Sequence, residues 1–202
     1  MAIIEQMVIR TQGFIVQRNL TLSRRLEGIE PGLEIINDRL SRRREFTFLQ
    51  DTAAKTEIVL GDGRLSLERE PPRGYDVLGI DAFSGDSIPM HLVTREAMAL
   101  YVKHLNPDGV IVFQATNRFI DLLPVVKRLA SEFGFEAVNV SDDPESGEGP
   151  EYWYSPTDQV IVTRNKKLLA WPRVADAAEE IEERKSLPIF TDSHHNLLRI
   201  LK

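Results

Sequence analysis

The sequence contains no cysteine and no apolar run long enough to cross a bilayer, and both absences narrow its class. Without cysteine the chain cannot form disulfides, thiolate metal sites or a cysteine nucleophile. The first residues, MAIIEQMVIRTQ, lack the basic region and long apolar core of a signal peptide. We therefore expect a cytoplasmic protein with no membrane segment in this chain.

Histidine is scarce as well, with only four in 202 residues. None has a partner at the spacing typical of metal ligands, so no metal is expected, and the adjacent pair His194-His195 is interpreted as a solvated helix feature. The formal net charge of −6 gives no general attraction to nucleic acid, whose binders usually present a basic face. The arginine run at 42–44 is interpreted as a solvated helix end.

What the chain does contain is an alternation of apolar runs with helical patterns, clearest between Tyr75 and Asn117. One apolar run ends on Asp81, a helix is predicted from Arg95 to Leu105, and a second run ends on Gln114. Such runs indicate buried parallel strands joined by crossover helices. The pattern predicts an α/β fold, with a mostly parallel sheet and helices on both faces.

The remaining elements follow from the same periodicities. Strands are predicted at 57–60, 136–140 and 159–163, with a strand or hairpin within 1–20, and helices at 32–43, 65–70, 119–133, 174–184 and 193–201. Pro124 is expected near the start of its helix and Gly134 at its end, and Thr191-Asp192 is expected to cap the last helix. The last two strands have no crossover helix between them, so we expect them to pair antiparallel.

These predictions suggest three regions. Residues 46–165 form the α/β core, residues 166–202 form a helical extension that packs on it, and residues 1–45 are a divergent or truncated N-terminal part.

Three residues near the ends of the two central strands are candidates for chemistry. A carboxylate at a buried strand end, such as Asp81, can hold an amine or take its proton, because open α/β sheets bind ligands there. Its alternative role is to cap the following loop. Asp86 is either a second carboxylate facing a cationic substrate or an ordinary turn residue. Gln114 either lines the same crevice or belongs to a turn.

Further acids are candidates for binding a nucleoside. Asp62 stands between two glycines after a strand, where it either accepts a hydrogen bond from an exocyclic amine or makes an Asx turn. Glu27 and Glu30 lie where an acid after a second strand would bind ribose hydroxyls, although their polar surroundings favour a surface role.

Several blocks, taken together and in order, resemble the polyamine aminopropyltransferases, the family of the spermidine synthases. The blocks are FTFLQD, IVLGDGRLSLE, YDVLGIDAFSGDSIPMHLVTREA, HLNPDGVIVFQATNR and FTDSHHNLLRILK. The resemblance runs from about Phe46 to Lys202 and is strongest to a bacterial branch whose synthase-like domain often follows a transporter-like membrane region. It implies the Rossmann-like fold of class I S-adenosylmethionine-dependent methyltransferases, with seven strands of which the last is antiparallel.

The resemblance also implies a reaction. In this family an aminopropyl group passes from decarboxylated S-adenosylmethionine to a diamine such as putrescine, and no metal takes part. Asp62, with Gly63 beside it, matches the position that reads the adenine amine. Asp81 matches the acid that binds and deprotonates the attacking amine.

The sequence departs from the family pattern in three places. Ser84 stands where the synthases usually carry a second acid, with Asp86 two residues later. No G-x-G precedes residue 51, although the family has a glycine-rich loop after its first strand. Gly28 stands at the place of the ribose-binding acid, unless Glu27 substitutes for it.

Three hypotheses therefore compete. The first is an aminopropyltransferase acting on a small polyamine substrate. The second is a methyltransferase that uses S-adenosylmethionine on another acceptor, since one fold hosts many reactions. The third is a non-catalytic interaction module, for instance a homodimer, because the glycine-rich loop is missing.

Overall fold

The computed structural model describes residues 3–11, 14–22, 57–60, 62–81, 89–142 and 156–202. The account below is confined to these residues. The predicted helix over 32–43 lies outside them.

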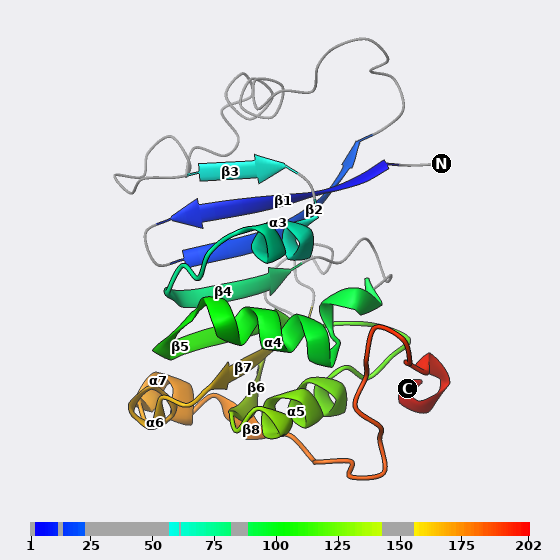
Figure 1. Cartoon of the computed structure of the whole chain (residues 1–202). Helices are drawn as coiled ribbons and strands as arrows, with labels where there is room; N and C mark the ends of the chain where they lie inside the picture. Colours follow the sequence, from blue (N-terminus) through cyan, green and yellow to red (C-terminus); the bar gives the residue numbers. More distant parts are fainter. Residues whose placement is uncertain (1–2, 12–13, 23–56, 61, 82–88, 143–155) are drawn as a thin grey trace, which may run out of the picture.

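One mixed sheet of eight strands, in the order β3-β1-β2-β4-β5-β7-β6-β8, organises the molecule (Figure 1). The strands are β1 (Ile3–Thr11), β2 (Phe14–Leu22), β3 (Glu57–Leu60), β4 (Tyr75–Asp81), β5 (Leu105–Gln114), β6 (Glu136–Asp142), β7 (Thr157–Thr163) and β8 (Ala178–Glu180). The pairings make β2 to β6 run in one direction and β1, β7 and β8 in the other. The predicted α/β class and the antiparallel pairing of β6 with β7 are confirmed.

The N-terminal hairpin lies inside this sheet, between β3 and β4. β1 and β2 pair antiparallel with each other, as the alternating residues of 1–20 predict. β1 then pairs with β3, and β2 pairs in parallel with β4, with Phe14 opposite Val77 and Arg18 opposite Asp81. The hairpin therefore bridges the strand that precedes Asp62 and the strand that ends in Asp81.

The three longer crossover helices lie together in front of the sheet in Figure 1. They are α3 (Gly63–Arg69), α4 (Arg95–His104) and α5 (Leu123–Glu132). Thr94 caps α4 by accepting from the amide of Ala97, Pro124 lies in the first turn of α5, and Gly134 has a φ of 68°, all as predicted. Shorter turns are η1 (Met90–Leu92), α6 (Lys166–Leu169), α7 (Pro172–Ala175) and η3 (Leu197–Ile200). None of the helices within the described ranges is long and apolar enough to span a membrane.

The helix predicted over 174–184 is wrong. The chain forms the short strand β8 there, with Val138 of β6 opposite Glu180. Acids that stand three or four residues apart repel one another in a helix, and the open edge of β6 offers backbone hydrogen bonds instead.

The helix predicted over 193–201 is also wrong, because only η3 is helical. Asp192 does not cap a helix here; its carboxylate binds Arg64. The backbone N–H of His194 donates to the hydroxyl of Thr191, which closes a turn.

Among the described residues, one core cluster joins the sheet, the crossover helices and the C-terminal segment, by which we mean residues 166–202. Tyr101 and Phe113 are among its fully buried side chains, and Tyr101 donates its hydroxyl hydrogen to the carbonyl of Leu92 at 3.0 Å. The C-terminal segment contributes buried apolar side chains to the same cluster: Ile181, Leu187, Phe190 and Ile200.

Candidate functional site

The carboxyl ends of β3, β4 and β5 meet at one edge of the sheet, because these strands run in the same direction. Asp81 is the last residue of β4 and is partly buried. The register of β4 with β5 extends to Ile80 opposite Phe113, one residue before Asp81 and Gln114. The structure therefore brings Asp81 and Gln114 to neighbouring strand ends, where open α/β sheets bind ligands.

The side chain of Gln114 is held by its neighbours. Its Oε1 accepts from the hydroxyl of Thr116 at 3.1 Å and from Nε2 of Gln159 at 2.9 Å. Gln159 lies on β7, so the antiparallel strand fixes the orientation of this amide.

Asp62 follows β3 and caps α3. Its Oδ1 accepts from the amide of Leu65 at 2.9 Å, so the local turn that the sequence allows is present. Its Oδ2 lies 3.0 Å from Nε2 of His91. A carboxylate only accepts, so His91 carries a proton on Nε2 and donates it to Asp62. Gly63 is the first residue of α3 and is buried.

A cavity of about 410 Å³ opens beside Asp62. This volume is within the range of small-molecule sites. The lining side chains come from α3, η1, the start of α4 and the C-terminal segment: Asp62, Arg64, Leu65, Glu68, His91, Thr94, Asp192 and His195.

Arg64 is the centre of a network of charged groups in the wall of this cavity. Its guanidinium donates to both carboxylate oxygens of Asp192 at 2.7 and 2.6 Å, and to Glu68 at 3.1 Å. It also donates to the backbone carbonyl of His91 at 2.6 Å. The hydrogen bonds from Arg64 hold the pKa of Asp192 at about 2, below its ordinary value of 3.8. The same pairing raises the pKa of Arg64.

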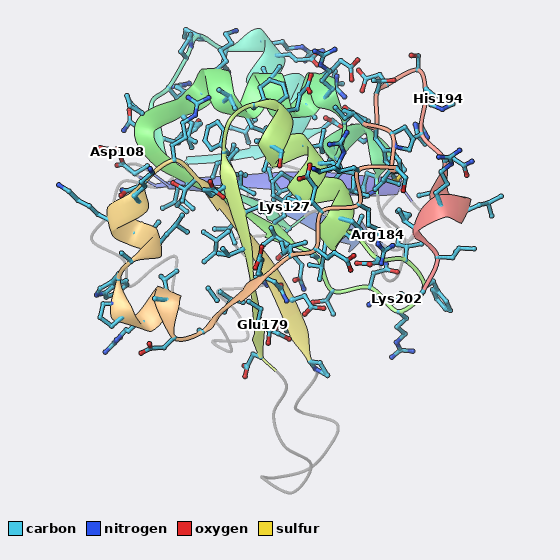
Figure 2. The ribbon with its side chains drawn as sticks, turned by 90° about the horizontal axis from the view of Figure 1, so that it is seen from below. Asp108, Lys127, Glu179, Arg184, His194 and Lys202 are labelled. Carbon is cyan, nitrogen blue, oxygen red and sulfur yellow. The ribbon has the colours of Figure 1, made fainter. Side chains whose placement is uncertain are left out.

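Sequence reasoning missed this network. His91 had no partner at metal-ligand spacing, and Arg64 was not among the candidate residues. The adjacent histidines are not in a helix; His195 lines the cavity, whereas His194 lies on the outer side of the C-terminal segment (Figure 2). The one signal available was the block FTDSHH, whose aspartate proves to be the partner of Arg64.

Three predicted site residues, Asp86, Glu27 and Glu30, lie outside the described residues. Their roles stay predictions. Within the described ranges no group of three or more histidine or acidic side chains could hold a metal ion.

No family model matches the chain. Among curated proteins, it is 33% identical over 116 residues to the polyamine aminopropyltransferase of Vibrio vulnificus (strain CMCP6), which covers 55% of this chain and 38% of that protein. It is 36% identical over 77 residues to the methionyl-tRNA formyltransferase of Clostridium tetani (strain Massachusetts / E88), which covers 38% of this chain and 24% of that protein. The chain thus spans well under half the length of the curated relatives it matches.

Solved structures with a similar chain trace include two spermidine synthases. A protein described as a "probable spermidine synthase" from Corynebacterium glutamicum ATCC 13032 has 25% identity and a TM-score of 0.43, covering 64% of this chain and 44% of that chain. The spermidine synthase from Thermotoga maritima has 18% identity and a TM-score of 0.44, covering 77% of this chain and 51% of that chain. The curated match confirms the resemblance to the polyamine aminopropyltransferases over about half of this chain.

Proposed function

We propose that the protein transfers an aminopropyl group from decarboxylated S-adenosylmethionine to a diamine such as putrescine. The observation that carries the proposal is the position of Asp81 at the carboxyl end of β4, at the sheet edge that Asp62 also reaches. These two acids match the family positions that handle the amine and the adenine, and the match to a curated aminopropyltransferase supports the assignment.

The spacing of the two acids suits a ligand that is long and narrow. β1 and β2 separate β3 from β4, so the strand ends are three spacings, or about 14 Å, apart. A nucleoside with its base at Asp62 would extend its sulfonium and aminopropyl chain along the edge toward Asp81. The base would then enter the site beside the 410 Å³ cavity.

Asp81 has two tasks in the proposed reaction. As a carboxylate it binds the ammonium form of the amine, and it accepts the proton that must leave before nitrogen can act as a nucleophile. The nitrogen lone pair then attacks the propyl carbon next to sulfur. A C–N bond forms as the C–S bond breaks, and the electron pair of the broken bond neutralises the sulfonium. Because the sulfonium is a good leaving group, the protein contributes mainly alignment and an uncharged nucleophile.

Other parts of the proposed site come from residues next to described strand ends. β2 runs parallel to β4, so the chain leaves β2 at the same edge, and Glu27 and Glu30 follow β2 in sequence as candidates for the ribose hydroxyls. Asp86 follows β4 and is the candidate for the second ammonium of a diamine. Gln114 is the candidate for lining the amine site from β5.

Calorimetric titration with decarboxylated S-adenosylmethionine and methylthioadenosine, with a transfer assay on putrescine, tests the proposal. We expect both nucleosides to bind and the assay to yield spermidine and methylthioadenosine. A preference for S-adenosylhomocysteine over methylthioadenosine would support the methyltransferase hypothesis instead. If neither nucleoside binds, the chain is not an aminopropyltransferase.

A further inference from the structure

We infer that Asp192 and Arg64 are positioning residues for the nucleoside. They hold His91, and His91 in turn holds Asp62, the acid proposed to read the base. The inference rests on the proposed function for its ligand, but the chain of contacts from residue 192 to residue 62 can be tested without any ligand.

The first link joins the C-terminal segment to α3 and α4. Asp192 receives the two hydrogen bonds from Arg64 and a third from the hydroxyl of Thr94 at 2.8 Å. Its own backbone N–H donates to Glu96 at 3.0 Å, and the amide of Arg95 donates to the carbonyl of Phe190 at 2.8 Å. Arg64 itself is only 9% exposed. The ion pair therefore joins a buried guanidinium to both oxygens of one carboxylate, and this bidentate geometry fixes how the two side chains are oriented.

The second link runs from Arg64 to His91. The short turn η1, which carries His91, has no side-chain cap at its N-terminus. The guanidinium of Arg64 donates to the backbone carbonyl of His91 at 2.6 Å. Because Asp192 fixes the planar guanidinium of Arg64, the guanidinium can hold the carbonyl of His91 in one place. Without the carboxylate of Asp192, the Arg64 side chain could adopt more orientations.

The third link runs from His91 to Asp62. Nε2 of His91 donates to Oδ2 of Asp62, while the amide of Leu65 donates to Oδ1. These two bonds set the rotamer of the carboxylate and use about two of its four acceptor positions. A base amine can therefore bind to Asp62 without displacing His91, provided that His91 keeps the carboxylate in this orientation. Loss of Asp192 should loosen His91 and then Asp62.

Glu183 offers a matched control. It also lies in the C-terminal segment and pairs with an arginine of the core, Arg128 of α5, at 3.0 Å. The exposure of the two acids is similar, 31% for the Glu183 side chain and 42% for that of Asp192. Glu183→Gln and Asp192→Asn thus each remove one charge and one ion pair from the same segment, but only Asp192 contacts the network that leads to Asp62.

The experiment compares Asp192→Asn, Glu183→Gln and Arg64→Lys in the full chain. Nitrogen-15 NMR of the imidazoles, with His91→Gln to assign its signal, reports on the bond from His91 to Asp62. In Asp192→Asn and Arg64→Lys we expect the nitrogen-15 chemical shifts of His91 to move toward the average of the two neutral tautomers, because the bond to Asp62 no longer selects one of them. In Glu183→Gln we expect these chemical shifts to be unchanged. An unchanged His91 signal in folded Asp192→Asn overturns the inference. If Asp192→Asn does not fold, the test rests on Arg64→Lys, which keeps the positive charge. An unchanged His91 signal in Arg64→Lys would then overturn the inference.

The second readout is function. For Asp192→Asn we expect methylthioadenosine affinity to fall about tenfold, the loss typical of one charged hydrogen bond, with the KM for putrescine unchanged. Equal losses for nucleoside and amine, or the same loss in Glu183→Gln, would mean that the ion pair only stabilises the fold. If the unaltered protein binds no nucleoside, the proposed function fails, and the His91 signal still tests the positioning network.

Discussion

At the scale of single residues, the sequence predicted that Asp81 lies at a strand end and Asp62 just after one, but it did not predict the contacts between Arg64 and Asp192. Asp81 could be found because a carboxylate that ends an apolar run marks the ligand edge of a sheet. Asp62 could be found because it stands between two glycines directly after a predicted strand. Arg64 and Asp192 could not, because 128 positions separate them and their pairing depends on how the C-terminal segment packs. Long-range ion pairs leave no periodic signal in a sequence.

Asp81→Asn should abolish most of the transfer activity. Asparagine keeps the shape of the side chain but cannot take a proton, and loss of a general base typically costs a factor of about 10² to 10⁴. The measurement is the initial rate with putrescine at saturating nucleoside. Asp76→Asn is the control, since Asp76 is an exposed carboxylate near the opposite end of β4. Equal rates in Asp81→Asn and the unaltered protein would remove Asp81 from the mechanism.

Two substitutions at Asp62 should separate its capping role from its proposed role in binding. Asparagine is as good an N-cap as aspartate, whereas alanine costs about 1 kcal/mol at such a position. We expect Asp62→Asn to keep the free energy of unfolding but weaken methylthioadenosine binding, and Asp62→Ala to lower both. Urea unfolding and calorimetry give the two quantities. If Asp62→Asn binds methylthioadenosine with full affinity, Asp62 caps α3 but does not take part in nucleoside binding.

At the scale of elements, periodicity predicted those that are bounded by clear caps or turns. α4 begins after Thr94 as predicted, and α5 carries Pro124 in its first turn. The failures lie in the C-terminal segment, where tertiary partners decide the outcome. Ala178–Glu180 pairs with β6 as an edge strand instead of forming a helix. Asp192 binds Arg64 instead of capping the predicted last helix. Local patterns cannot show such competition between partners.

The ion pair between Arg64 and Asp192 should make stability depend on pH in the acid range. The pKa of Asp192 is about 2 in the folded protein and 3.8 as an ordinary value, so the folded state prefers the carboxylate. Its contribution is complete above pH 3.8 and is lost as the pH falls toward 2. Urea unfolding of the protein and of Asp192→Asn should therefore give free energies that converge on acidification. If the difference between the two free energies of unfolding did not change with pH, the ion pair between Arg64 and Asp192 would be contradicted.

Gly109→Ala should destabilise the middle of β5. A Cβ at this position would lie 2.6 Å from Cγ of Leu105 and 2.7 Å from the backbone carbonyl oxygen of Tyr75. Since the backbone of β4 cannot move away freely, we expect a loss of about 1 to 3 kcal/mol in the free energy of unfolding. Asp108→Ala, at the exposed neighbouring position, is the control. If Gly109→Ala lowers the free energy of unfolding by less than Asp108→Ala does, the backbone of β5 can shift to accommodate the added methyl group.

At the scale of the whole molecule, the core is continuous from the sheet to the C-terminal segment. Phe190 and Ile200 are fully buried in the same cluster as Phe113 of β5. The separation into a core at 46–165 and an extension at 166–202 stays a prediction about the chain's organisation. The shared cluster favours one cooperative unfolding unit for the described part of the chain.

Phe190→Ala tests this cooperativity. Truncation of a buried phenylalanine typically costs about 3 to 5 kcal/mol, and in a single cooperative unit the loss should appear for the whole molecule. We expect far-UV circular dichroism and tryptophan fluorescence to show coincident transitions at lower urea. Leu198→Ala is the control, since Leu198 is 77% exposed and should change stability by less than about 0.5 kcal/mol. Separate transitions would indicate an independent C-terminal unit.

The position of the β1–β2 hairpin between β3 and β4 also has a consequence for biosynthesis. The hairpin is synthesised before β3 and β4, so its two outer edges stay unpaired until those later strands are available. Two unpaired edges that persist during synthesis are a template for pairing with other chains. Closing such long loops is also slow. The protein should therefore be most prone to aggregate before residue 81 is available, and slower translation upstream of that point should lower its yield.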